Sequence, residues 1–171
     1  NSGLFLDKGS AIQSADLENS ILLYTGISTK QTKTYSSGPV KYVGIKQDEN
    51  TLLLTFSYQL DYEIYYPGLG FVISDYIGNK VFGSSVMIDN VPIERKPRKS
   101  GKIIVRINQP KLFNGTYKLS VWFGDGLRDF FADKECLEFD VINMANFHQA
   151  KSNSISGSVY PECYWNFDDY N

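Results

Sequence analysis

Two acidic residues, Glu138 and Asp140, have the spacing in this sequence that best suits acid-base chemistry. Side chains two residues apart on an extended strand point to the same side and lie about 7 Å apart. Glycosidases hold their two carboxyl groups across a sugar at about 5 to 10 Å. Nothing in the neighbouring sequence indicates a raised pKa or a dedicated acid, and solvated carboxylates are common on strands. Glycoside hydrolysis is therefore an alternative hypothesis, and the same pair also suits a polar binding surface.

Other candidates for catalytic or metal chemistry have ordinary structural explanations. The single histidine, His148, lies in a polar stretch without a recognisable nucleophile, so we interpret it as an exposed loop residue. Asp125, Asp129 and Asp133 offer the hard oxygen ligands that suit calcium. Gly124-Asp125-Gly126 is nevertheless typical of a tight turn, and we favour the turn. The sequence predicts no catalytic centre, no metal site and no cofactor.

The cysteines indicate a compartment. Cys136 and Cys163 are too few to staple a secreted domain of 171 residues, so the cytoplasm is expected. Strand alternation predicts that Cys136 points outward and Cys163 inward, so we expect no disulfide between them. We find no secretory leader and no apolar run of about 18 residues that could span a bilayer. The start at Asn1-Ser2-Gly3 suggests a domain cut from a longer protein.

Charge and composition restrict the class of partner. The formal net charge is -2 and the sequence pI is about 5.4, so no overall positive field gathers phosphates. Nucleic acid is therefore not an expected partner. The 12 Tyr, 11 Phe and 2 Trp residues exceed the needs of a sandwich core, and aromatic rings also suit flat, partly apolar ligands. The composition indicates a binding function.

Strands must position these candidate residues, because apolar and polar residues alternate along most of the chain. A glycine-containing turn at 77–79 joins two of the predicted strands as a hairpin. Short strands between turn signals predict an all-β fold, an immunoglobulin-like antiparallel β-sandwich over residues 38–171. Residues 1–37 are polar and are expected to form a linker or N-terminal arm. The predicted strands are 40–46, 51–60, 71–76, 80–85, 102–108, 116–123, 136–142 and 157–165.

Trp122 is the most informative residue for binding. Its strand sends Val121 and Phe123 toward the core, so alternation turns Trp122 outward. An outward tryptophan among polar neighbours can stack on a sugar ring, but the N-terminal arm or a dimer partner could equally cover it. Immunoglobulin-like topology places 71–76, 116–123 and 136–142 in one sheet. We predict that its outer face carries Ser74, Tyr76, Lys118, Ser120, Trp122, Glu138 and Asp140.

The last predicted strand follows a long polar connection at 143–156. Such a connection lets the strand pair within its own chain or cross to a neighbouring protomer. If it joins the edge of the tryptophan-bearing sheet, Tyr160, Glu162 and Tyr164 extend the predicted binding face. Lys118 or a basic residue in 95–99 can bind a phosphate or carboxylate on a sugar. For the basic run we favour an ordinary solvated loop.

Several segments, taken in order, resemble the C-terminal carbohydrate-binding domain of Wzt-type proteins. Those proteins are the ATP-binding subunits of ABC transporters that export O-antigen polysaccharide. The resemblance covers about residues 38–166, and its specificity comes from the order and spacing of the segments. The segments are Gly70-Phe71-Val72-Ile73-Ser74-Asp75, Gly78-Asn79-Lys80-Val81-Phe82-Gly83, Asn114-Gly115-Thr116-Tyr117-Lys118-Leu119-Ser120-Val121, Cys136-Leu137-Glu138-Phe139-Asp140-Val141, and Gly157-Ser158-Val159 with Trp165.

The resemblance implies a sandwich dimer, with the C-terminal strand exchanged in at least some members, and a groove for the modified non-reducing end of a glycan. No G-x-x-x-x-G-K-[ST] motif occurs, so the chain is not expected to hydrolyse ATP. The predicted function is non-catalytic recognition of an O-antigen terminus, which couples chain completion to export. The alternatives are a dimerisation or adaptor domain without a glycan site, and a glycosidase. The implied partners are the polysaccharide, a second copy and the membrane-spanning transporter subunit, at the inner face of the inner membrane.

Overall fold

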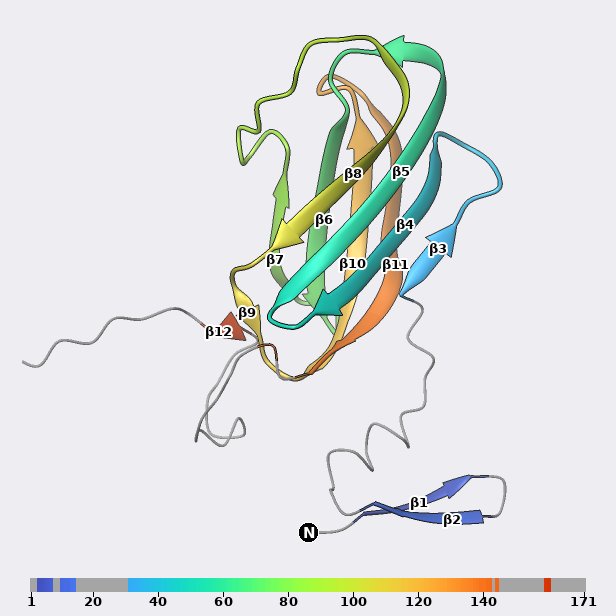
Figure 1. Cartoon of the computed structure of the whole chain (residues 1–171), viewed down its shortest axis with the longest axis vertical. Coiled ribbons are helices and arrows are strands. Elements are labelled where there is room, and N and C mark those ends of the chain that lie inside the picture. Colours follow the sequence, from blue (N-terminus) through green and yellow to red (C-terminus); the bar gives the residue numbers. More distant parts are fainter. Residues whose placement is uncertain (1–2, 8–9, 15–30, 143, 145–158, 161–171) are drawn as a thin grey trace, which may run out of the picture.

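The structure, a computed structural model, describes residues 3–7, 10–14, 31–142, 144 and 159–160. All regular elements in these ranges are strands (Figure 1). Two antiparallel four-stranded sheets form a sandwich, which confirms the predicted fold class. β1 (Gly3–Asp7) and β2 (Ser10–Ser14) make a separate hairpin. The described residues include no helix with the length and apolar character needed to span a bilayer.

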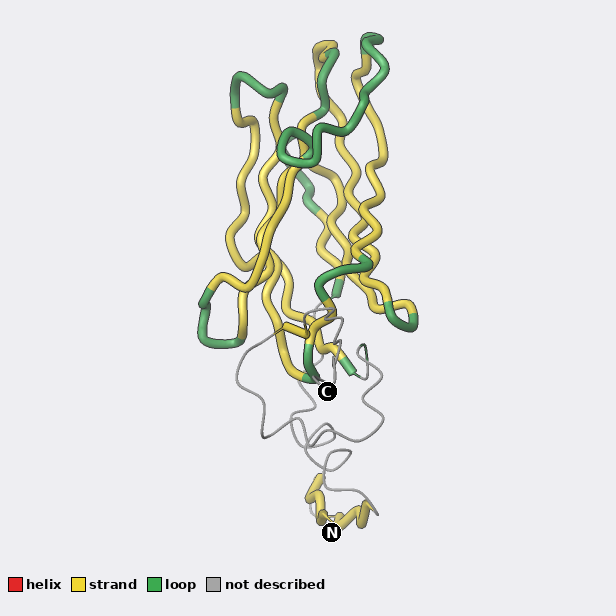
Figure 2. The backbone as a smooth tube through the Cα atoms, turned by 90° about the vertical axis from the view of Figure 1, so that its left-hand side faces the viewer, coloured by secondary structure: helices red, strands yellow, loops and turns green. Residues whose placement is uncertain are grey.

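The sheets have the strand orders β11-β10-β6-β7 and β3-β4-β5-β8. The second sheet lies toward the viewer in Figure 1, and Figure 2 shows the two layers from the side. β6, β10 and β11 share one sheet, and β6 and β7 form the predicted hairpin, as the sequence indicates. The remaining strand bounds are β3 Thr32–Thr34, β4 Val40–Asp48, β5 Thr51–Ile64, β6 Gly68–Asp75, β7 Lys80–Ser85, β8 Arg98–Ile107, β9 Lys111–Leu112, β10 Gly115–Gly124, β11 Asp129–Val141 and β12 Val159–Tyr160.

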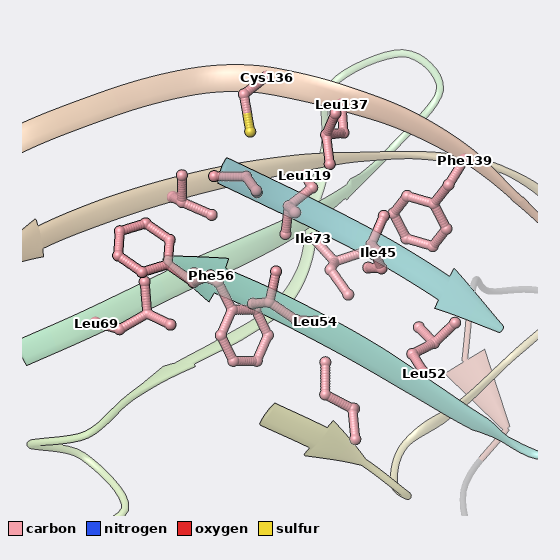
Figure 3. Packing of buried hydrophobic residues seen from close by; sticks show 14 of the residues in the cluster. Ile45, Leu52, Leu54, Phe56, Leu69, Ile73, Leu119, Cys136, Leu137 and Phe139 are labelled. Carbon is pink, nitrogen blue, oxygen red and sulfur yellow. The ribbon is translucent and has the colours of Figure 1, made fainter. Parts of the chain in front are cut away.

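Alternating apolar residues from both sheets build the core (Figure 3). On β5 the side chains of Leu52, Leu54 and Phe56 are buried, while the intervening residues are half-buried on the outer face. The ring of Phe56 packs against Phe123 of the opposite sheet at a centroid distance of 5.2 Å. Each such buried side chain contributes about 2 to 3 kcal/mol relative to exposure. This packing fixes which residues of each strand remain on the outside.

The strand β11 breaks the alternation through a bulge. Leu137 pairs with Leu119, but Asp133 pairs with Val121, so residues 134–136 lie opposite one residue of β10. Glu135, with φ 50°, carries the irregularity. The bulge turns Cys136 into the core, where it is 7% exposed, so the predicted outward orientation is wrong (Figure 3). Burial raises the pKa of this free thiol to about 11, and the predicted orientation of Cys163 lies outside the described residues.

The predicted N-terminal arm contributes an edge strand, because β3 pairs with β4. From this edge Lys33 Nζ forms an ion pair with Asp133 Oδ2 of the opposite sheet at 2.5 Å, and the hydroxyl of Tyr35 donates to the same oxygen at 2.6 Å. Burial raises the pKa of Asp133, but the hydrogen bonds from Lys33 and Tyr35 and the charge of Lys33 lower it overall. These three side chains, here called the clasp, connect the two sheets at one edge.

Candidate functional site

The candidate site is the outer face of the sheet β11-β10-β6-β7, here called the Trp122 face. Outward residues of β10 occupy its centre because Tyr117, Leu119, Val121 and Phe123 are buried in the core. The predicted outward orientation of Trp122 agrees with its half-buried position on this face. Cross-strand pairs then place β6 on one side of β10 and β11 on the other. The outward β10 residues are Thr116, Lys118, Ser120 and Trp122.

The indole of Trp122 lies over the backbone of Gly70. The two residues are directly paired across β10 and β6. A Cβ atom added at Gly70 would collide with Cε2 and Cζ2 of the indole ring. The glycine therefore leaves room for the indole ring over the backbone of β6. A flat aromatic surface of this kind suits the C–H groups of a sugar ring.

A hollow of about 160 Å³ adjoins Trp122 at the end of the sheet. Its wall combines apolar side chains, among them Met87 and Leu127, with the charged Arg128 and Asp129. Leu127 is 93% exposed at the tip of the turn between β10 and β11. A mixed apolar and charged lining can contact both faces and hydroxyl groups of a small ligand. The remaining lining residues are Gly68, Leu69, Ser85, Trp122, Gly124 and Gly126.

Lys118 is held by neighbours on both sides of its strand. Its Nζ donates to Glu135 Oε2 at 3.0 Å and lies 5.8 Å from the ring centroid of Tyr76, which is 61% exposed. The hydrogen bond to Glu135 raises the pKa of Lys118; burial opposes this shift, and the charges of Glu135 and Glu138 add to it. The ammonium group thus stays charged and oriented above the face. The group is available to bind a phosphate or carboxylate on a sugar, which is the role predicted for it.

The two predicted serines differ in accessibility. Ser120 is half-buried, and its Oγ accepts a hydrogen bond from the backbone N–H of Glu135 at 2.9 Å. Ser74 is 6% exposed, so the prediction that it lines an open surface is wrong. It lies on a central strand between Lys118 of β10 and Lys80 of β7, whose side chains are much longer than that of serine. Ser74 thus lies on the outward side of β6 but is not accessible at the surface of the face.

Glu138 and Asp140 lie on this same outer face, both half-buried, as predicted. The register pairs Glu138 with Lys118 and Asp140 with Thr116. Asp140 Oδ1 accepts a hydrogen bond from the Thr116 hydroxyl at 2.7 Å. The two carboxylates are therefore flanked by a cation and a hydroxyl group. Such an arrangement fits hydrogen bonding to a polar ligand and gives neither group the apolar surroundings of a catalytic acid.

Of the three aspartates considered as a calcium site, Asp125 and Asp133 have separate structural roles. Asp125 Oδ1 accepts hydrogen bonds from the backbone N–H groups of Leu127 and Arg128 at 2.9 and 2.8 Å. Gly126 has φ 86°, a left-handed value that favours glycine. The favoured interpretation as a turn is confirmed. Asp133 belongs to the clasp between the sheets and does not join this turn.

The basic run at 95–99 is engaged with its own loop. Arg98 donates to the carbonyl oxygens of Glu94 and Lys96 at 2.8 and 3.2 Å, and Lys96 forms an ion pair with Glu94 at 2.6 Å. These contacts agree with the favoured interpretation as a solvated loop. The run does not line the hollow beside Trp122.

The last predicted strand is described over two residues. β12 pairs with β9 and not with the edge of the Trp122 face, because Tyr160 lies opposite Lys111. The condition under which Tyr160 would extend the Trp122 face is therefore not met by the pairing within this chain. Tyr164, Glu162 and His148 lie outside the described residues.

Sequence reasoning missed several residues of the site. Gly70 was detectable in principle, since an isolated glycine within a strand often marks a close approach. Glu135 reaches Lys118 through the bulge, and no glycine or asparagine announces that bulge in the sequence. Met87 and Arg128 arrive from connections between strands, whose placement alternation does not predict.

The fold first defines the class of the molecule, an all-β domain built as an antiparallel sandwich. The chain belongs to the family of Wzt C-terminal domains, whose family model matches residues 41–160. This family is the C-terminal, non-catalytic domain of the cytoplasmic ATPase subunit of O-antigen ABC transporters. The family resemblance inferred from the sequence is thereby confirmed.

A solved structure of a Wzt C-terminal domain agrees with the fold. A crystal structure of the C-terminal domain of Wzt superposes with a TM-score of 0.50 at 12% sequence identity, covering 75% of this chain and 87% of that one. Wild-type OgpA from Akkermansia muciniphila matches with a TM-score of 0.36 at 20% identity, covering 74% of this chain and 37% of that one. A search of curated proteins gives no match.

Proposed function

We propose that this domain recognises the modified non-reducing end of an O-antigen polysaccharide and couples completion of the chain to export by the transporter. The observation that carries the proposal is the half-buried indole of Trp122, which lies over Gly70 and lines a hollow of about 160 Å³. An aromatic ring beside a small recess provides a stacking surface for one sugar and a space for a terminal group.

The polar residues of the Trp122 face support a sugar ligand over an apolar one. Lys118, Ser120, Glu138 and Asp140 supply a cation, a hydroxyl group and two carboxylates on the same face, along β10 and β11 from the tryptophan. Sugars present hydroxyl groups that donate and accept hydrogen bonds, so a mixture of both signs suits them better than a surface of one sign.

A titration tests the proposal directly. The domain is titrated with O-antigen polymer that carries its native terminal group and with polymer that lacks it, by isothermal titration calorimetry. Selective binding of the first polymer without cleavage is expected. Binding of neither polymer would leave the dimerisation or adaptor hypothesis, and release of shortened polymer would implicate Glu138 and Asp140 in hydrolysis.

Replacing Trp122 with Ala locates the site. We expect the affinity for the complete polymer to fall by about 1 kcal/mol or more, because the stacking surface is lost. Tyr62→Ala is the matched control, since it removes an exposed aromatic ring from β5 of the opposite sheet. Circular dichroism checks that both variants keep the fold. Equal affinity of Trp122→Ala and the original protein would remove Trp122 from the site.

The homodimer and the transporter complex belong to the same proposal. In this chain β12 pairs with β9, and a second copy could supply the same pairing from its own C-terminal strand. Equilibrium sedimentation of the chain, and of a truncation that ends at residue 144, tests the exchange. A dimer that survives the truncation unchanged would exclude the C-terminal strand as the exchanged element.

A further inference from the structure

The outer face of the second sheet, β3-β4-β5-β8, carries three cations that form no ion pair among the described residues. We call it the Tyr42 face. On β5 the residues Leu53, Thr55 and Ser57 point outward, since Leu52, Leu54 and Phe56 are buried. The register pairs each outward residue with one from β4 and one from β8. The three rows across the sheet are Lys46, Leu53 and Arg106; Gly44, Thr55 and Ile104; and Tyr42, Ser57 and Lys102.

The centre of this face is a shallow groove of about 560 Å³. The ring of Tyr42 lies over Gly44, since a Cβ atom added to the glycine would collide with the tyrosine ring and its hydroxyl group. Hydroxyl groups of Thr32, Thr55 and Ser57 line the same groove. The groove therefore offers an aromatic ring and several hydrogen-bonding groups within one concave surface.

Lys46 and Lys102 line this groove, and Arg106 lies in the row of Lys46 and Leu53 beside it. Lys46 and Arg106 flank Leu53 and are two strand spacings apart, about 10 Å between Cα atoms. Lys102 lies four residues from Arg106 along β8, about 13 Å away. None of the three forms an ion pair among the described residues. The described part of the face also carries carboxylates near both ends, Asp48 beside the turn between β4 and β5, and Asp61 and Glu63 on β5 beyond the paired rows.

This charge pattern is local. The chain as a whole has a net charge of -2, so three unpaired cations on one face are not the result of a basic composition. On the Trp122 face, by contrast, Lys118 is paired with Glu135 and lies near further carboxylates. Unpaired cations about 10 Å apart above hydroxyl groups and a ring suit a ligand with spaced negative charges and a polar, partly apolar body.

We propose that the Tyr42 face is a second binding surface, which takes a sugar chain that carries carboxylate or phosphate groups. Lys46, Lys102 and Arg106 bind the anionic groups, and Thr55 and Ser57 bind sugar hydroxyl groups between them. The ring of Tyr42 packs against a sugar. The surface is independent of Trp122, because the two faces lie on opposite sides of the core, and it does not require the ligand proposed for the Trp122 face.

The test uses an oligosaccharide of known charge. The chain is titrated by calorimetry with hexagalacturonate, with a phosphorylated oligomannose and, as neutral control, with maltohexaose. Binding of at least one anionic oligosaccharide and none of maltohexaose is expected. An oligothymidylate with the same number of charges serves as a second control, and binding as tight as that of the sugars would overturn the proposal in favour of a nonspecific cationic surface.

Variants assign the binding to this face. The triple variant Lys46→Gln, Lys102→Gln, Arg106→Gln should bind the anionic oligosaccharide about tenfold less tightly. The matched control Lys80→Gln, Lys99→Gln, Lys134→Gln removes three exposed lysines elsewhere and should change the affinity less than twofold. Trp122→Ala should leave it unchanged, so failure of this proposal and failure of the proposed function are distinguishable. Tyr42→Ala should weaken oligosaccharide binding about threefold without changing binding of inorganic phosphate.

Two results overturn the proposal. One is the absence of binding to both anionic oligosaccharides. The other is an affinity that the triple variant and its control reduce equally, which would make net charge rather than the Tyr42 face responsible. Because all six exchanged side chains are exposed, circular dichroism and thermal unfolding should show that every variant keeps the fold.

Discussion

The two outer faces of the sandwich share a construction and differ in charge. On each, an aromatic ring lies over a glycine, Trp122 over Gly70 and Tyr42 over Gly44. Around Trp122 the cation Lys118 is paired with Glu135, whereas the cations around Tyr42 have no ion pair among the described residues. One core can therefore present two chemically distinct surfaces, since alternation fixes only which side chains point outward.

The shared core gives the largest expected effect. Phe56→Ala removes a ring that packs against Phe123 of the opposite sheet and should lower the free energy of unfolding by about 3 to 5 kcal/mol. Both faces should then lose binding together as the domain unfolds. Urea unfolding followed by circular dichroism measures the change. Loss of binding at one face with unaltered stability would show that the faces do not depend on one cooperative core.

The clasp between the sheets should give the second-largest change in the free energy of unfolding. Asp133→Asn weakens the contacts of Lys33 and Tyr35 and should lower the free energy of unfolding by about 2 kcal/mol at pH 7. Since the pKa of Asp133 is lower when folded than when unfolded, its contribution is present above the unfolded pKa near 4. It is lost as the pH falls through the folded pKa.

Urea unfolding of both proteins at pH 7 and pH 2.5 measures this dependence. The difference between the original protein and Asp133→Asn should shrink at the lower pH. Asp129→Asn, at an exposed position of the same strand, is the matched control and should change stability little. A difference that is independent of pH would show that the charge of Asp133 does not stabilise the fold.

The glycines beneath the rings distinguish the faces. Gly70→Ala places a Cβ atom against the indole of Trp122 and should weaken binding of the complete polymer about tenfold, with no effect on hexagalacturonate. Gly44→Ala should do the reverse at the Tyr42 face, because its Cβ atom would collide with the tyrosine ring. Calorimetric titration of both variants with both ligands tests this. A variant that weakens both ligands equally would contradict separate sites.

Salt gives the smallest effect and compares the faces without mutation. Raising NaCl from about 50 to about 500 mM should weaken hexagalacturonate binding about fivefold, because exposed cations are screened. Binding of an uncharged polymer terminus at the Trp122 face should change less than twofold. Titrations at three salt concentrations measure both slopes. Equal slopes would mean that the charge difference between the faces does not determine their ligands.

Alternation predicted most of this fold because the core strands obey it. β5 and β10 bury every second residue over most of their lengths, so their inward and outward sides follow from the sequence. The sequence did not predict β3, because its three residues are all polar and show no alternation of apolar and polar side chains. In β11 the bulge at Glu135 shifts the period, which placed Cys136 on the wrong side. A local backbone irregularity leaves no trace in apolar spacing when no glycine marks it.

The candidate site was predictable where it depends on orientation and not where it depends on neighbours. Trp122, Lys118 and Ser120 were placed correctly because one strand carries them. Ser74 has the predicted parity, yet lysines on both adjacent strands leave it buried. The position of Tyr160 depends on which strand pairs with β12. Pairing between distant segments cannot be inferred from the local sequence pattern.

The position of Trp122 over Gly70 has a spectroscopic consequence. The chain has two tryptophans, so Trp165→Phe leaves the indole at 122 as its only one. That indole lies over the backbone of Gly70 and lines the hollow, so a group bound in the hollow changes the polarity around the chromophore. The emission maximum of this one residue then becomes an optical readout of occupancy, and it requires no label.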